Sequence, residues 1–313
     1  MVATWEDFYA KNPPPTDFEK SETLMKEFTL HHAKKNTKVV LITSGGTTIP
    51  LERNTVRYVD NFSAGTRGSI SAEQFLEFGY AVIFIYRIKS LEPFSRHFTG
   101  QKLLEMLEPT EVNHKKTLSV RSEYSDKICN VFAKYKEAIN EKKLLQIGFT
   151  TLSEYLWLLR SACQALAPIK QMAILYLAAA VSDFYVPVDE MSLHKIPSNG
   201  PPTISLHLAP KILTPLVSLW VPKAFVVSFK LETDEKLLIL KARNALINYK
   251  HNLVIANMLQ NRKQQVTIVD GEKDYVISLT DEQLNKGEEI EKYIVIDLAE
   301  KHSNFIRMAQ EQT

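Results

Sequence analysis

Three neighbouring stretches decide the fold: "KVVLITSGG" (residues 38–46), "SISAEQFLEFG" (69–79) and "YAVIFIYR" (80–87). The first and third are apolar and rich in β-branched residues, which is typical of strands that are buried on both faces. The middle stretch has helical spacing of apolar residues and ends in a glycine. A strand, a helix and a second strand in this order predict a right-handed parallel crossover.

The alternation of strand and helix continues along the chain. We expect further strands over 143–150, 173–181, 203–210, 223–229 and 252–256, and helices over 17–34, 95–109, 125–143, 151–168, 211–222, 235–250 and 286–306. Expected helix caps are Thr16, and Thr151 or Ser153. Two short strands, 264–271 and 274–279, flank Glu-Lys and predict a hairpin at the sheet edge. These elements predict one α/β domain over 1–313, with a helical extension over 1–35 and a doubly wound, mostly parallel sheet.

Composition excludes several classes of protein. The 313 residues are 45% apolar and 24% charged, with a net charge of +2, which gives no basic footprint for nucleic acid. The two cysteines form no metal-type spacing and are compatible with a reducing compartment. The N-terminus lacks a signal-peptide pattern, and no apolar run is long enough for a membrane span. We expect a cytoplasmic protein without nucleic-acid or membrane partners.

Two glycine stretches lie inside the first strand–helix unit. "TSGGTT" (43–48) ends the strand, and "NFSAGTRG" (61–68) opens the helix. Either stretch alone is more typical of a tight turn or of close helix packing. Two stretches that converge on one helix start favour contact with a phosphate, because free N–H groups lie there. Neither matches G-x-G-x-x-G or a P-loop, which weakens the dehydrogenase and P-loop kinase interpretations.

Other polar residues follow the ends of predicted strands, where open α/β sheets bind ligands. The candidates are Arg57 between the glycine stretches, Asp183 after a run of alanines, Lys195 in a Pro-rich loop, Lys230 and Asn257. Each has an ordinary alternative as a solvated side chain or a turn cap. The histidines form no triad and no metal motif, so a divalent ion would take much of its shell from triphosphate oxygens.

The motifs "LITSGGTTIPLERNTVRYVDNFSAGTRG", "LAAAVSDFYVP", "HKIPS", "SFKLETD" and "VIANML" occur in this order and spacing. Together they resemble the eukaryotic phosphopantothenoylcysteine synthetases, the phosphopantothenate–cysteine ligases of coenzyme A biosynthesis. The resemblance runs from about residue 36 to the C-terminus, and residues 95–145 are its least distinctive part.

This resemblance implies a modified Rossmann-like fold with dimerisation segments and a two-step ligation. The carboxylate of 4′-phosphopantothenate attacks the α-phosphate of ATP or CTP, with Mg²⁺, and pyrophosphate leaves. The amine of L-cysteine then attacks the acyl-nucleotide and the monophosphate leaves. The bacterial branch uses CTP, and animal members of the eukaryotic branch prefer ATP. The resemblance also implies a homodimer, and association with other enzymes of coenzyme A synthesis stays open.

The resemblance also implies roles for particular residues. The nucleotide would contact Gly45, Ser63, Gly65, Gly68, Phe229, Lys230 and Asn257. Phosphopantothenate would contact Asn61, Ala179, Ala180 and Asp183, with Arg57 reaching its phosphate from the other subunit. Lys195 matches a flap lysine that supports the chemistry, so Asn61, Lys195 and Arg57 are the catalytic candidates. Lys211 falls near a further lysine of the bacterial motif.

Two other functions stay open at this point. One is a nicotinamide- or flavin-dependent oxidoreductase on a similar sheet, against which the missing fingerprint counts. The other is a non-catalytic subunit of a coenzyme A-synthesising complex. Every family position named above is filled in this chain, which favours an active enzyme.

Overall fold

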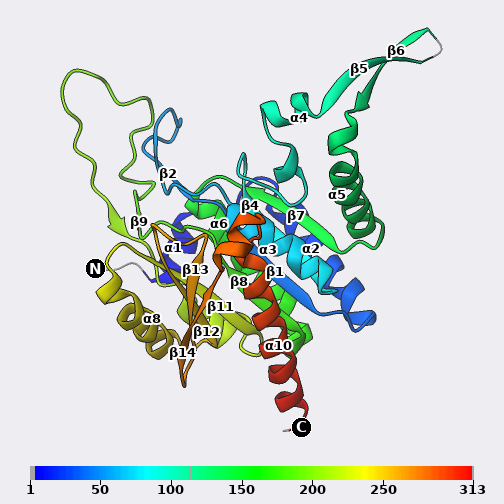
Figure 1. The fold of residues 1–313 in the computed structure, drawn as a ribbon. Coiled ribbons are helices and arrows are strands. Elements are labelled where there is room, and N and C mark those ends of the chain that lie inside the picture. The colour runs from blue at the N-terminus through cyan, green and yellow to red at the C-terminus, as the bar shows by residue number, and fades with distance from the viewer. Residues whose placement is uncertain (1–3, 113, 312–313) are drawn as a thin grey trace.

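The fold is built on one twisted, mostly parallel sheet of eight strands, in the order β14-β13-β12-β11-β8-β1-β4-β7 (Figure 1). The computed structural model describes residues 4–112 and 114–311. The parallel strands are β1 (Val39–Ser44), β4 (Ala81–Arg87), β7 (Leu144–Phe149), β8 (Ala173–Leu177), β11 (Phe225–Glu232) and β12 (Leu253–Met258). The antiparallel strands β13 (Gln265–Val269) and β14 (Asp274–Ser278) form the predicted edge hairpin.

The order of the strands reverses at β1. The chain first adds β4 and β7 on one side of β1, and then adds β8, β11 and β12 on the other side. The carboxyl ends of β1 and β8 therefore flank the switch point at which doubly wound sheets bind ligands. This arrangement confirms the predicted α/β class.

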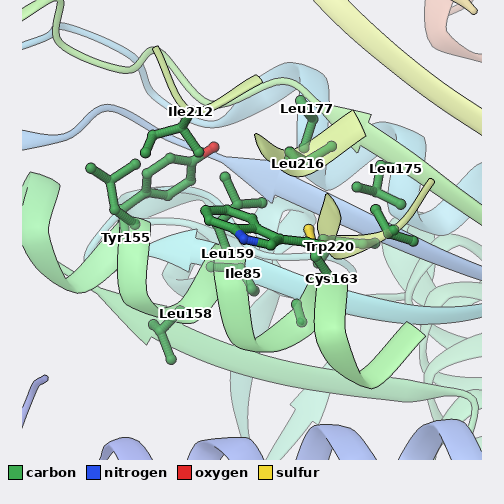
Figure 2. Close-up of a cluster of buried hydrophobic side chains, with 14 of the residues drawn as sticks. Ile85, Tyr155, Leu158, Leu159, Cys163, Leu175, Leu177, Ile212, Leu216 and Trp220 are labelled. Atoms are coloured by element: carbon green, nitrogen blue, oxygen red, sulfur yellow. The ribbon is translucent and has the colours of Figure 1, made fainter. Parts of the chain in front are cut away.

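Helices cover both faces of the sheet. One face packs against α3 (Thr66–Glu77) and α10 (Ile290–Glu311) in a cluster that contains Phe75, Phe84, Tyr176 and Ile294. The other face packs against α2 (Phe18–Lys34), α6 (Leu152–Leu166) and α8 (Glu235–Tyr249). Figure 2 shows Tyr155, Leu159 and Cys163 of α6 beside Trp220 and the strands.

The N-terminal segment belongs to this core. Helix α1 (Trp5–Lys11) and α2 contribute Phe8, Tyr9 and Met25 to the same apolar cluster as α6. Trp5 and Trp220 pack edge to face with ring centroids 5.6 Å apart, and Tyr9 and Trp157 do so at 4.7 Å. Residues that precede the family motifs therefore complete the cover of one sheet face.

The remaining elements are short or lie outside the two layers. They are η1 (Ser95–Phe98), α4 (Gln101–Glu105), α5 (Ser122–Asn140), η2 (Ala167–Met172), α7 (Leu213–Pro215), η3 (Leu216–Trp220), α9 (Asp281–Asn285) and the strands of three two-stranded sheets. Those strands are β2 (Thr48–Pro50) with β3 (Tyr58–Asp60), β5 (Leu107–Val112) with β6 (Lys115–Val120), and β9 (Phe184–Tyr185) with β10 (His207–Leu208).

Three predicted elements are corrected. The expected helix over 95–109 is only η1 and α4, and its last residues enter the β5–β6 hairpin that projects from the sheet (Figure 1). The expected strand over 203–210 pairs only at His207–Leu208, where it bonds β9 outside the main sheet. The expected strand over 173–181 pairs within the sheet only as far as Leu177.

The helix caps also differ in part from expectation. Helix α6 begins with a capping box. The Thr151 hydroxyl accepts from the backbone N–H of Glu154, and the Glu154 carboxylate accepts from the backbone N–H of Thr151. Helix α2 instead has Asp17 at its N-cap, without a side-chain hydrogen bond, so Thr16 does not cap it.

Candidate functional site

The candidate site lies at the switch point, where the loops after β1 and β8 join. Gly45 follows β1 with a φ of +85°, a conformation that L side chains rarely adopt. The backbone N–H of Ala180 donates to the carbonyl of Gly45 at 2.8 Å, and that of Thr47 donates to Ala180 at 3.1 Å. The first glycine stretch and Ala180 are therefore held side by side at the carboxyl edge of the sheet.

The second glycine stretch packs directly on the end of β1. Gly65 is the N-cap of α3 with a φ of +78°, and its carbonyl accepts a hydrogen bond from Ser44 Oγ at 3.1 Å. A Cβ atom on Gly68 would lie 2.4 Å from Ser44 Oγ. These glycines are thus needed for close packing, and the same packing places the N-terminus of α3 at the switch point.

Asn61 and Ser63 lie at the start of the second glycine stretch. The backbone N–H of Asn61 donates to Thr47 at 3.2 Å. Within residues 4–112 and 114–311, the side-chain amide of Asn61 has no hydrogen-bond partner. Ser63 Oγ accepts from the backbone N–H of Gly65 at 3.4 Å. Beside this loop, a cleft of about 450 Å³ is lined by residues that include Ala64, Ser90 and Phe98. The amide of Asn61 is therefore free to bind a ligand.

Phe229 and Asn257 share one face of the sheet. Phe229 is paired with Ile255, so Asn257, two residues further along β12, projects to the same side. The Phe229 ring packs edge to face on Tyr176, with centroids 4.9 Å apart. Burial raises the pKa of the Tyr176 hydroxyl, which stays neutral and bonds Ser71 Oγ at 2.8 Å. This aromatic wall lies on the same face as α3.

The structure does not bring Lys230 to this group. Lys230 is paired with Ala256, whose side chain faces α8 on the opposite side of the sheet. Its Nζ lies 3.3 Å from Glu232, a carboxylate that also pairs with Lys241 of α8. Alternation along a strand, which sends neighbouring residues to opposite faces, already carried this signal in the sequence.

The remaining candidates lie on loops at the same edge. Asp183 has an exposed side chain, and its backbone carbonyl accepts from Ala209 at 2.8 Å. Lys195 and Lys211 are exposed. Arg57 forms an ion pair with Glu52 at 2.9 Å, and its side chain is 41% exposed.

Sequence reasoning missed Arg87, which braces the first glycine stretch. Arg87 ends β4 and donates through Nη1 to the carbonyl of Gly46 at 3.2 Å and to Asp60 at 2.7 Å. An arginine that directly follows an apolar strand was the available signal, because such a side chain reaches over the carboxyl edge of the sheet. The sequence also gives no role to Glu52, in the segment between the two glycine stretches.

The described part of the chain contains neither a cluster of metal-ligating side chains nor a helix suited to cross a membrane. Residues 4–112 and 114–311 hold no group of three or more His, Cys, Asp or Glu side chains that could bind a metal ion. None of the helices in those residues combines the length and apolar character needed to cross a bilayer.

Glycine loops at the switch point, a helix N-terminus and an aromatic wall are typical of doubly wound α/β proteins that bind nucleotides. Residues 159–300 match the DNA/pantothenate metabolism flavoprotein C-terminal domain. The chain is 45% identical to the phosphopantothenate–cysteine ligase of Mus musculus over 303 residues, which cover 96% of this chain and 97% of that protein.

Two further comparisons agree. Identity to the phosphopantothenate–cysteine ligase CAB2 of Saccharomyces cerevisiae is 40% over 328 residues, covering 96% of this chain and 86% of that one. A solved structure of a Cab2 mutant in complex with phosphopantothenate-cysteine has a TM-score of 0.88 and 39% identity, covering 97% and 99% of the two chains. The chain belongs to the phosphopantothenate–cysteine ligase family.

Proposed function

We propose that this protein joins 4′-phosphopantothenate and L-cysteine to give 4′-phosphopantothenoylcysteine, a step of coenzyme A biosynthesis. The observation that carries the proposal is the identity of 45% to a phosphopantothenate–cysteine ligase across 96% of the chain. The oxidoreductase alternative is not favoured, because the Cab2 structure with the same fold holds phosphopantothenate-cysteine.

In the first half-reaction, the carboxylate of phosphopantothenate attacks the α-phosphorus of the nucleotide. The bond to pyrophosphate breaks, and an acyl-nucleotide forms. In the second, the amine of cysteine attacks the acyl carbon, loses a proton, and displaces the nucleoside monophosphate. A carboxylate is already a nucleophile, so the site must chiefly position the reactants, neutralise phosphate charge and exclude water from the anhydride.

The geometry supports a division of the site between the two substrates. The glycine loops with Gly45, Ser63, Gly65 and Gly68 would hold the phosphates, and Phe229 and Asn257 would contact the base and sugar. Asn61, Ala179, Ala180 and Asp183 would hold phosphopantothenate. Asn61 opens the second glycine stretch beside Thr47 of the first, and its free amide suits a contact near the reacting carboxylate.

Two cations would act on the phosphates. Lys195 would bring its ammonium onto negative charge that develops at the acyl-nucleotide. Arg57 would hold the phosphate of phosphopantothenate bound to the partner subunit of a homodimer. Mg²⁺ would be held largely by triphosphate oxygens and water, which suits its preference for oxygen ligands.

We further propose that the nucleotide is ATP and that the protein acts in the cytoplasm. The supporting argument for ATP is the resemblance to the eukaryotic branch, whose animal members prefer ATP, together with the 45% identity to the ligase of Mus musculus. Kinetics with ATP and CTP side by side test this choice. Sedimentation tests the homodimer.

The decisive experiment measures pyrophosphate release. The proposal expects release that depends on phosphopantothenate, and ligated product only after cysteine is added. Absence of pyrophosphate under these conditions overturns it. Asn61→Asp and Lys195→Gln should lose turnover while they stay folded, and full activity of both variants would contradict the assigned site. Wild-type protein that binds the substrates without turnover would indicate a non-catalytic subunit.

A further inference from the structure

The carboxylate of Glu52 is buried between two loops of the site. Glu52 lies in the turn between β2 and β3, and its side chain is 0% exposed. A buried carboxylate needs several hydrogen-bond donors to remain charged, because it has lost its contact with water. The donors around Glu52 come from two segments that are distant in the sequence.

Four donors surround this carboxylate. Oε2 accepts from the backbone N–H groups of Val56 at 3.1 Å and Arg57 at 2.9 Å. Oε1 accepts from Arg57 Nη1 at 2.9 Å and from the backbone N–H of Ile196 at 3.4 Å. The Arg57 backbone N–H above all, with Val56, Ile196 and the guanidinium, lowers the pKa of Glu52 to about 2. The carboxylate is therefore ionised at neutral pH.

The contact with Ile196 is part of a longer seam. The backbone N–H of Arg53 donates to Ser192 at 2.9 Å, and that of Asn54 donates to Leu193 at 3.1 Å. Arg57 Nη1 also donates to the carbonyl of Ile196 at 3.3 Å. Figure 1 shows the loop after β2 beside the long loop that follows β9. Glu52 thus fastens the long loop one residue away from Lys195.

We propose that Glu52 is a positioning residue that holds Arg57 and Lys195 in the places where they act in the ligation. This inference rests on the proposed function, because it takes the roles of Arg57 and Lys195 from it. Glu52 itself touches no reacting atom. Its buried carboxylate holds the backbone beside Lys195 and orients the guanidinium of Arg57.

The contacts leave both cations free to act. Lys195 is exposed, and its side chain has no partner in residues 4–112 and 114–311, so only its backbone is held. Arg57 bonds Glu52 and Ile196 through Nη1 alone, within those same residues, which leaves Nη2 and Nε for a phosphate. A fixed backbone with a free ammonium lowers the entropy that must be lost when the lysine meets its target.

Glu52→Gln tests the proposal, because glutamine keeps the shape but loses the charge and one acceptor. We expect kcat to fall about 100-fold, as small misplacements of reacting groups can do, with the nucleotide KM within about twofold of wild type. Glu190→Gln is the matched control: Glu190 lies in the same loop but is exposed and pairs with His207. It should keep wild-type kcat.

A double-mutant cycle separates positioning from a merely structural role. If Glu52 acts through Lys195, adding Glu52→Gln to Lys195→Gln should lower kcat by much less than 100-fold. Losses that multiply in full would overturn the proposal, as would wild-type kcat in folded Glu52→Gln. Should Glu52→Gln fail to fold, Glu52→Asp takes its place, and the same two outcomes decide.

Trypsin cleavage after Lys195 provides a test that needs no activity. Cleavage should be about tenfold faster in Glu52→Gln than in wild type, since proteolysis follows the population of locally opened states. Unchanged cleavage would contradict the fastening of the loop. If the wild type shows no ligation, the proposed function fails while this measurement still reports on the Glu52 contact.

Discussion

The carbonyl of Asn61 lies directly against Gly46. A Cβ atom on Gly46 would be 1.7 Å from that oxygen, far inside any contact distance. On the same edge, the backbone N–H of Asn61 donates to Thr47 at 3.2 Å. The two glycine stretches therefore pack against each other at the end of β1. The segment between them leaves this strand end and returns to it.

Gly46→Ala should disrupt this junction. The added methyl meets backbone, which cannot rotate away, so we expect a loss of about 3 kcal/mol in unfolding free energy and almost no turnover. Chemical denaturation and pyrophosphate release measure the two effects. Gly271→Ala is the control, since a Cβ there meets nothing within 4 Å. An active, stable Gly46→Ala protein would contradict the close approach.

The two faces of β11 should differ in their effect on nucleotide binding. Phe229→Ala removes the proposed base contact and should raise the nucleotide KM about tenfold, as loss of an aromatic stacking partner does. Lys230→Met changes the face toward α8, where Lys230 pairs with Glu232, and should leave that KM unchanged. Steady-state kinetics on both variants decide, and a larger effect at Lys230 would reverse the assignment.

Much of the fold could be predicted because burial leaves a pattern in the sequence. Strand β1 is buried along its whole length and β4 over residues 81–85, and α3 between them buries Ile70, Ala72 and Phe75. The β5–β6 hairpin left no such pattern, since Leu118 is 72% exposed and the side chains around it are mostly solvated. The leucines of "QKLLEML" (101–107) have helical spacing, which predicts a helix past Glu105, whereas the chain enters β5 at Leu107.

The sequence could suggest the residue types of the candidate site, but not the contacts that support them. Glycines at the starts of loops can be recognised in the sequence, because few other residues adopt a positive φ such as that of Gly45. Glu52 and Arg87 act through partners that only the fold supplies. Glu52 meets the N–H of Ile196 across 144 residues of sequence, and Arg87 meets Gly46 across 41.

Arg160 should stabilise the N-terminal segment. Its guanidinium lies over the rings of Tyr9, Trp5, Trp157 and Trp220, with the shortest distance, 4.9 Å, to Tyr9. Arg160→Met keeps an apolar stem but removes the cation, and should cost about 2 kcal/mol of unfolding free energy. Turnover should stay unchanged, because none of these residues belongs to the proposed site. Arg121→Met, at an exposed ion pair with Glu123, is the control and should change stability little.

His302 should make stability depend on pH. The side chain is 0% exposed, with Nε2 bonded to the carbonyl of Gln171 at 2.8 Å and Nδ1 to the Tyr80 hydroxyl at 2.9 Å. Nε2 must donate to the carbonyl, so Nδ1 of the neutral ring accepts from Tyr80. Burial, with a smaller effect of Lys38, lowers the pKa of His302 from 6.5 to about 4.

The sign follows from proton binding. Between pH 6.5 and about 4 the unfolded chain binds a proton at His302 that the folded chain does not, so stability falls as pH falls. The contribution of neutral His302 to the unfolding free energy is complete above pH 6.5. About 3 kcal/mol of it is lost once the pH has fallen to about 4. Thermal unfolding at pH 7 and pH 5 should therefore show a smaller drop in Tm for His302→Gln than for wild type. Burial also lowers the pKa of His251 to about 4. Because His251 is present in both proteins, part of the drop in Tm should remain in His302→Gln. His194→Gln, at an exposed histidine, should match wild type, and an equal drop in His302→Gln would show that His302 does not carry the effect.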